Sequence, residues 1–385
     1  MSKRIVIMGP AHPLRGGLAS FNERLAREFI REGNEVSLCS FSFQYPSFLF
    51  PGTTQYSSEP APADLSIRSL IHSVNPLNWL STGWKLMREK HDLIIVRYWL
   101  PFMGPCLGTI LRIVRLNKKT RIICIADNII PHEKRPGDSL FTRYFIASVH
   151  GFITMSEKVM SDLKKFTHKP ALQLRHPLYD NFGEAMDPAE ARKALGLIPN
   201  SPVILFFGFI RKYKGLDLFI EAIHHLKKTG WLQQHPVQFL VAGEFYENPE
   251  PYLNSIRERE VTNEIILHHH FIPDSEIRLY LSAATVVIQP YHHATQSGVT
   301  PLAYHFEKPM IVTRVGSLPD LVPDSVGIVT EAEATSLAEG IIRFFSRNED
   351  EMKQHIKEEK KKFGWDIFCR AILSLNTDPT YDIPK

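Results

Sequence analysis

Short apolar runs alternate with amphipathic stretches along the whole chain. In the first half, continuous apolar segments that are typical of strands covered on both faces of a sheet occupy residues 4–8, 35–41, 92–99, 121–127 and 151–156. Apolar residues at helical spacing follow several of them, as at Leu18, Phe21, Leu25 and Phe29. This alternation predicts a doubly wound, Rossmann-like α/β domain.

The same pattern returns in the second half of the chain. Further strands are predicted at residues 203–207, 238–244, 264–271, 285–291, 309–316 and 326–331. Loop-forming residues near Pro177, Gly183 and Pro188 place a boundary near residue 180. We therefore expect two doubly wound Rossmann-like α/β domains, residues 1–180 and 181–356, facing a central cleft, and a helix in residues 357–385 that crosses back to the first domain.

Composition narrows the class of protein. The chain has 385 residues, 44% of them hydrophobic, and a net charge of 45 − 41 = +4 with both signs mixed, which argues against a dedicated nucleic-acid binder. The four cysteines are scattered without metal-ligand spacing, as expected of free thiols in a reducing compartment. No stretch of 18 uncharged apolar residues and no signal-like h-region occurs. We expect a cytoplasmic protein.

The segment FFGFIRKYKGLDLFIEAI, residues 206–223, carries the strongest chemical signal. A buried strand ends at Gly208, an amphipathic helix begins near Gly215, and Arg211, Lys212 and Lys214 lie in the loop between them. The N-terminus of a helix presents free N–H groups and a positive dipole end, so this junction is suited to holding phosphate. By itself, this junction is better explained as a solvated turn with surface cations.

Other loops at the same ends of predicted strands also have unusual chemistry. In open α/β sheets the loops beyond the carboxyl ends of the strands converge on one ligand site. Gly16 and Gly17 would let the backbone approach a pyrophosphate, and Gly243 and Glu244 follow the strand that ends at Ala242. A nicotinamide dehydrogenase is excluded, because the first loop has no G-x-G-x-x-G and the second strand does not end in an acidic residue.

A second polar loop lies in residues 286–322. Thr295, Gln296, Ser297, Gly298 and Val299 lead into a helix and could hydrogen-bond a phosphate or sugar hydroxyls. The histidine triplet 268–270 lies in a predicted strand, where alternate side chains point to opposite faces, so we assign no metal site.

Together these segments resemble the retaining glycosyltransferases of the glycosyl transferases group 1 family, which have the GT-B fold. The matching segments span nearly the whole chain: the Gly16-Gly17 loop and residues 75–79, 96–105, 127–135, 211–215, 271–284 and 295–304. The resemblance implies transfer of a sugar from a nucleotide diphospho-sugar to a glycan or lipid-linked acceptor, as in cell-surface polysaccharide synthesis, with no metal and no cofactor. It also implies roles for individual residues.

By this resemblance, Arg211 and Lys214 neutralise the donor diphosphate and Gly16 and Gly17 supply amides to it. The base lies against Phe271, Ile272 and Pro273, while Asp127 and His132 are the acceptor-side candidates.

The sequence departs from the family pattern at three places. Phe209 stands where an arginine is usual, Thr295 and Ala303 stand where two glutamates are usual, and Asp127 replaces a histidine. Two alternatives to a transferase therefore stay open. One is a catalytically silent subunit that binds nucleotide-sugar or acts as a scaffold, and the other is a nucleotide-sugar epimerase of the same fold.

Leu77, Leu80, Trp84 and Met87 recur at helical spacing beside cations. This stripe has two interpretations, ordinary core packing or peripheral contact with the inner face of a membrane that carries a lipid-linked acceptor.

Overall fold

The computed structural model divides the chain into two compact units, Met1–Pro177 with Gly364–Lys385, and Leu178–Phe363. It describes residues 2–46, 54–131, 135–294 and 297–377. The division after residue 177 lies beside the boundary that the sequence predicts near residue 180. The last helix, α15 (Trp365–Thr377), forms part of the first unit.

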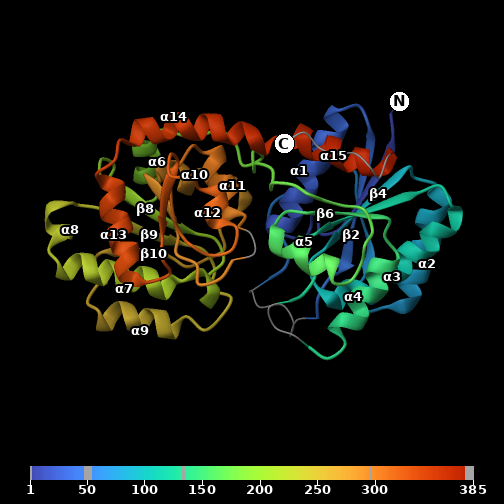
Figure 1. Cartoon of the computed structure of the whole chain (residues 1–385), viewed down its shortest axis with the longest axis horizontal. Coiled ribbons are helices and arrows are strands. Elements are labelled where there is room, and N and C mark those ends of the chain that lie inside the picture. Colours follow the sequence, from blue (N-terminus) through green and yellow to red (C-terminus); the bar gives the residue numbers. More distant parts are fainter. Residues whose placement is uncertain (1, 47–53, 132–134, 295–296, 378–385) are drawn as a thin grey trace. The chain divides into compact units, whose positions relative to one another are not determined.

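The first unit is built on a seven-stranded parallel sheet with the order β3-β2-β1-β4-β5-β6-β7 (Figure 1). Its strands are β1 (Arg4–Met8), β2 (Glu35–Phe43), β3 (Ile67–His72), β4 (Leu93–Tyr98), β5 (Arg121–Ala126), β6 (Gly151–Thr154) and β7 (Ala171–Gln173). Its other helices are α1 (Gly17–Arg31), α2 (Pro76–Glu89), η2 (Pro101–Met103), α3 (Gly104–Val114), η3 (Arg115–Asn117), α4 (Asp138–Ala147) and α5 (Glu157–Lys164).

Helices cover both faces of this sheet. Val6 and Met8 face one core, which side chains from α2, α3, α4 and α5 complete. Arg97 points to the other face, because it lies between Val96 and Tyr98 of that core and successive side chains in a strand alternate. There its guanidinium lies 4.0 Å from the centroid of the Phe21 ring of α1. Phe21 also contacts Trp365 of α15, with ring centroids 5.0 Å apart.

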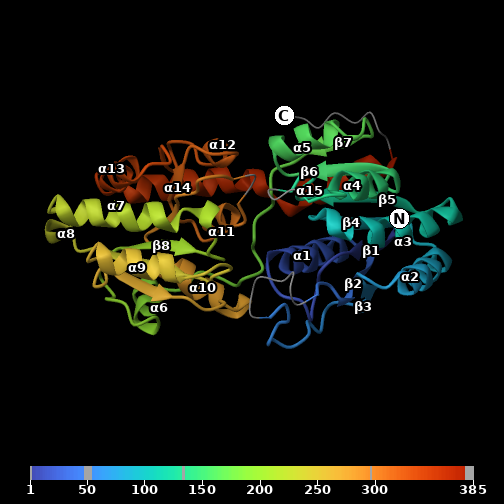
Figure 2. The ribbon, with the colours of Figure 1, turned by 90° about the horizontal axis from the view of Figure 1, so that it is seen from below.

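The second unit contains a six-stranded parallel sheet with the order β10-β9-β8-β11-β12-β13. Figure 2 shows its strand β8 among the surrounding helices. Its strands are β8 (Val203–Phe207), β9 (Gln238–Ala242), β10 (Ile265–His268), β11 (Val286–Gln289), β12 (Met310–Thr313) and β13 (Gly327–Thr330). Its helices are α6 (Pro188–Ala194), η4 (Lys212–Lys214), α7 (Leu216–Lys228), α8 (Trp231–Gln234), α9 (Glu250–Glu258), α10 (Asp274–Ala283), α11 (Val299–His305), α12 (Leu318–Leu321), α13 (Ala334–Phe345), α14 (Glu349–Glu359) and η5 (Lys360–Phe363).

The two units thus have doubly wound parallel α/β architecture, as the sequence predicts. In each, the chain starts at a central strand, winds outward in one direction and then returns to wind in the other. The order reverses between β1 and β4 in the first unit and between β8 and β11 in the second. Loops beyond the carboxyl ends of such a strand pair diverge, which is where open α/β sheets bind ligands.

Three sequence expectations need correction. The edge strands β3 and β7 were not predicted, because their alternating or short patterns lack the apolar run of an interior strand. Strand β10 ends at His268, so the argument from alternation does not apply to His269 and His270. Leu77, Leu80 and Trp84 are not core residues, because all three are exposed on α2. Within the described ranges, no helix is long and apolar enough to cross a membrane.

Candidate functional site

The loop between β8 and α7 lies at the reversal point of the second sheet. It packs tightly against the segment that follows β11: a Cβ added at Gly215, which has a φ of 70°, would lie 1.8 Å from the Pro290 carbonyl oxygen. Only glycine fits such a position, because any side chain there would overlap backbone. The glycine therefore fixes Lys214, its neighbour, against the start of the β11–α11 loop.

Lys214 is a half-buried cation at the end of this loop. Burial and, to a smaller extent, the positive charge of Arg211 lower the pKa of its ammonium group to about 8. The Lys214 Nζ lies 5.8 Å from the centroid of the Tyr291 ring. Among the residues that the structure describes, neither Lys214 nor Arg211 makes an ion pair with a carboxylate. Two cations held together in this way are stabilised when an anion binds between them.

Arg211 lies on an aromatic surface formed by Phe209, Tyr246 and Phe271. Its guanidinium carbon is 5.2 Å from the Tyr246 ring centroid. The Phe209 ring centroid lies 4.2 Å from that of Tyr246 and 6.3 Å from that of Phe271. We call these three rings the aromatic shelf. Phe209, which stands where the resemblance leads one to expect an arginine, thus contributes a ring to the shelf, and Arg211 lies two residues later.

The β11–α11 loop is held from inside by a buried hydrogen-bond network. Gln289 Oε1 accepts hydrogen bonds from Ser297 Oγ, at 2.6 Å, and from Thr300 Oγ1, at 3.1 Å. The Tyr291 hydroxyl lies 3.2 Å from Ser297 Oγ, which in turn accepts the Val299 amide at 3.2 Å. The Val299 N–H is therefore occupied within the protein. Thr295 and Gln296 lie outside the described residues.

Two further strand ends contribute backbone to this region. A Cβ at Gly243 would lie 2.1 Å from the Gly208 carbonyl oxygen, so the loops after β8 and β9 touch through their backbones. The Glu244 carbonyl accepts the Ile210 amide at 2.8 Å, and the Glu244 side chain is buried. Ile272 is buried before α10, and Pro273 is the N-cap residue of that helix.

In the first unit, Asp127 is engaged in a buried ion pair. Arg97 donates two hydrogen bonds to its carboxylate, at 2.5 and 2.6 Å, and is only 2% exposed. The sequence analysis missed Arg97, although an arginine inside an apolar strand was a visible signal. Gly16, with a φ of 99°, is the N-cap of α1, and Gly17 is the first residue of that helix. His132 lies outside the described residues.

Among the described ranges, no group of three or more histidine, cysteine, aspartate or glutamate side chains is placed to hold a metal ion. The loops described above bring together cations, aromatic rings, backbone amides and hydroxyls in the second unit. Such a set fits an organic phosphate.

Residues 187–363 match the model of a known protein family, described as glycosyl transferases group 1. The second unit belongs to this family. The group 1 domain covers the β8–α7 loop, the aromatic shelf and the β11–α11 loop.

Curated relatives share part of the chain. A D-inositol 3-phosphate glycosyltransferase from Xylanimonas cellulosilytica is 25% identical over 199 residues, which are 49% of this chain and 45% of the relative. An alpha-D-kanosaminyltransferase from Streptomyces kanamyceticus is 23% identical over 228 residues, 56% of each chain. A glycogen synthase from Thermus thermophilus is 26% identical over 231 residues, 60% of this chain and 49% of the relative. The chain thus spans about half the length of these relatives.

Solved structures resemble the whole chain. A glycosyltransferase from Rickettsia africae matches with a TM-score of 0.72 at 13% identity and covers 100% of both chains. Sucrose-phosphate synthase from Thermosynechococcus elongatus matches with a TM-score of 0.71 at 14% identity, over 97% of this chain and 98% of that one. Anabaena HepE in complex with UDP matches with a TM-score of 0.70 at 15% identity, over 96% and 98%. The fold is that of the GT-B glycosyltransferases.

Proposed function

We propose that this protein is a retaining glycosyltransferase that transfers a sugar from a nucleotide diphospho-sugar to a glycan or lipid-linked acceptor. The observation that carries the proposal is the pair Lys214 and Arg211, which lack a carboxylate partner among the described residues at the reversal point of a doubly wound sheet. A diphosphate supplies the missing negative charge. Structures of HepE with UDP and with UDP-glucose support this class of ligand.

The proposed role of the two cations is electrostatic. When the bond between the anomeric carbon and the β-phosphate oxygen breaks, both electrons leave with the phosphate. The acceptor oxygen forms the new bond to the anomeric carbon on the same face, and its proton is released. Lys214 and Arg211, already held in place, stabilise the charge that develops on the phosphate. These cations supply the positive charge, so we expect no requirement for a divalent metal or another cofactor.

The aromatic shelf and the buried Ile272 offer an apolar surface for the base of the donor. The sugar is expected at Ser297 and Gly298, in the loop that Gln289 holds from below. Asp127, oriented by Arg97, is the acceptor-side carboxylate of the proposal. We further propose a role in cell-surface polysaccharide synthesis at the cytoplasmic face of the membrane.

The proposal is tested by incubating the full chain with UDP-, GDP- and ADP-sugars and a panel of glycan and lipid-linked acceptors. NMR of the product reports the configuration at the anomeric carbon, and EDTA tests for a metal. Transfer with retention is expected. A catalytically silent subunit would bind a donor without consuming it, and an epimerase would convert a donor without any acceptor. Either of these results would overturn the proposal.

A further inference from the structure

Helix α2 carries large apolar side chains on its exposed side. Leu77, Leu80 and Trp84 follow one another at intervals of three and four residues and are 77%, 45% and 46% exposed. The side of α2 that faces the core is formed by Thr82, Gly83 and Leu86. Single exposed apolar residues are common on protein surfaces, but a stripe along one helix marks a contact surface.

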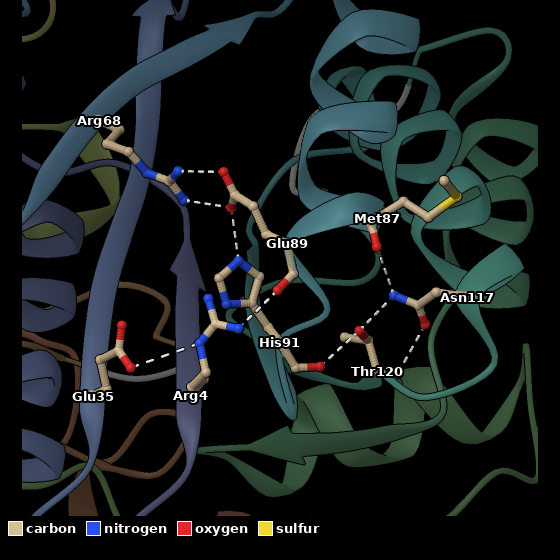
Figure 3. A network of polar contacts seen from close by, with 8 residues as sticks. All are labelled: Arg4, Glu35, Arg68, Met87, Glu89, His91, Asn117 and Thr120. Atoms are coloured by element: carbon tan, nitrogen blue, oxygen red, sulfur yellow. Dashed lines mark hydrogen bonds and ion pairs between the residues drawn. The ribbon is translucent and has the colours of Figure 1, made fainter.

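Exposed cations lie at one end of this stripe. Lys85, Arg88 and Lys90 are exposed at the C-terminal end of α2. The short helix η3 lies against the same end, because Asn117 Nδ2 donates a hydrogen bond to the Met87 carbonyl oxygen at 3.2 Å (Figure 3). Helix η3 adds an exposed leucine and three exposed cations at its end: Leu116, Arg115, Lys118 and Lys119.

The acidic residue of α2, Glu89, interacts with side chains outside this helix. Glu89 accepts two hydrogen bonds from Arg68, at 2.7 and 3.0 Å, and its carboxylate lies 2.8 Å from His91 Nε2 (Figure 3). Residues 76–90 and 104–119 together contain seven lysines and arginines and one acidic residue, 7 − 1 = +6, whereas the whole chain is +4. The rest of the chain is therefore net negative, 4 − 6 = −2, so the net positive charge of the chain comes from these two segments.

We propose that this surface binds the anionic face of a lipid bilayer. The α2–η3 surface consists of Leu77, Leu80, Trp84, Leu116, Lys85, Arg88, Lys90, Arg115, Lys118 and Lys119. A bilayer with anionic headgroups matches both of its properties, because apolar side chains enter the headgroup boundary while lysines and arginines contact the headgroups. A second copy of the chain fits poorly, because two such surfaces carry the same charge and repel each other. The proposal stands independently of the glycosyl transfer.

The test is flotation of the purified full chain with vesicles of phosphatidylcholine, with and without about one-third phosphatidylserine. Binding is expected only to the anionic vesicles and should decrease in 0.5 M NaCl, since salt screens the headgroup charge. Each surface cation contributes about fivefold to the partition coefficient. The double variant Lys85→Glu/Arg88→Glu should therefore lose at least tenfold in binding.

Matched variants distinguish binding through the α2–η3 surface from nonspecific binding to vesicles. Leu80→Ser/Trp84→Ser should lose binding, and Trp84→Phe should keep it. Ile30→Ser changes an exposed apolar residue of α1, on the other face of the sheet, and should have no effect. Lys164→Glu/Lys193→Glu changes the net charge equally at two other exposed lysines and should bind as the parent does, apart from a small change.

Three results would overturn the proposal. They are failure to bind anionic vesicles at low salt, equal loss in the control variants, and a dimer in sedimentation that Trp84→Ser abolishes. Thermal unfolding and donor binding of each variant should match the parent, so failure of the membrane proposal is distinguishable from failure of the transferase proposal.

Discussion

The two units place charged side chains at the carboxyl ends of central strands but satisfy them differently. In the first unit, Arg97 at the end of β4 is paired with Asp127 after β5, within the protein. In the second unit, Lys214 and Arg211 follow β8 and have no carboxylate partner among the described residues. A protein that leaves two neighbouring cations unpaired loses stability unless something else neutralises them. This difference is why we propose the second unit, rather than the first, as the place where an external anion binds.

The largest expected effect comes from breaking the ion pair between Arg97 and Asp127 in the first unit. Arg97→Ala removes the two hydrogen bonds and the positive charge that Arg97 brings to the buried Asp127 carboxylate, so the free energy of unfolding of the first unit should fall by about 3–5 kcal/mol. For a unit of this size, that corresponds to a decrease of roughly 6–20 °C in the first-unit transition measured by calorimetry. Arg97→Met/Asp127→Leu should lose much less, because no buried charge remains. Equal losses in the two variants would contradict the ion-pair account.

The next largest effect is expected on donor turnover when Lys214 is removed. Lys214→Ala should reduce donor turnover by ~10²-fold or more, because one prepositioned charge at the leaving phosphate is lost. Thermal unfolding without ligand should be unchanged or improved, since a half-buried charge with no carboxylate partner among the described residues is removed. Lys212→Ala, which changes an exposed cation of the same turn, is the control and should retain most of the activity. Unchanged turnover in Lys214→Ala would remove this residue from the mechanism.

The pH dependence of donor binding tests whether the charge of Lys214 contributes to donor affinity. The pKa of Lys214 in the free protein is about 8, because burial disfavours its charged form. Its protonated fraction therefore falls about tenfold between pH 7 and pH 9, and affinity for a nucleotide diphospho-sugar should fall by up to that factor. In Lys214→Arg the guanidinium stays charged, so the profile should be flat. Calorimetric titration at several pH values measures this, and identical profiles would contradict the assignment.

The smallest effect concerns the ring beneath Arg211. Tyr246→Leu removes a cation–π contact of about 0.5–1 kcal/mol, so the KM for the donor should rise about two- to fivefold. Tyr246→Phe keeps the ring face and should behave as the parent does. In an Arg211→Ala background, Tyr246→Leu should add little, because its effect acts through the guanidinium. A full additional loss in that background would mean that Tyr246 contacts the ligand on its own.

The contrast between the units also shows how far the sequence was informative. Interior strands such as β4 and β8 were predictable because burial on both faces requires continuous apolar runs. The edge strands β3 and β7 were not, since one side of each is free and their residues need not be uniformly apolar. The Arg211 to Gly215 segment was recognisable because cations and glycine meet at a strand–helix junction.

Contacts between distant segments could not be predicted from the sequence in the same way. The Arg97 ion pair joins residues 30 positions apart, and the Gln289 network depends on which side chains of β11 turn inward. The position of Tyr246 under Arg211 depends on the backbone contact between Gly208 and Gly243. The exposure of α2 could not be decided from spacing, because an apolar stripe at helical intervals fits a core and a surface equally well.

The most direct test of the central claim is calorimetric titration of the full chain and Lys214→Ala with UDP, GDP and ADP, each beside its nucleoside. We predict that one nucleoside diphosphate binds at least tenfold more tightly than its nucleoside, and that Lys214→Ala removes most of that difference. Equal affinity for a nucleoside and its diphosphate would contradict the claim that Lys214 and Arg211 form a diphosphate site. An unchanged difference in Lys214→Ala would also contradict it.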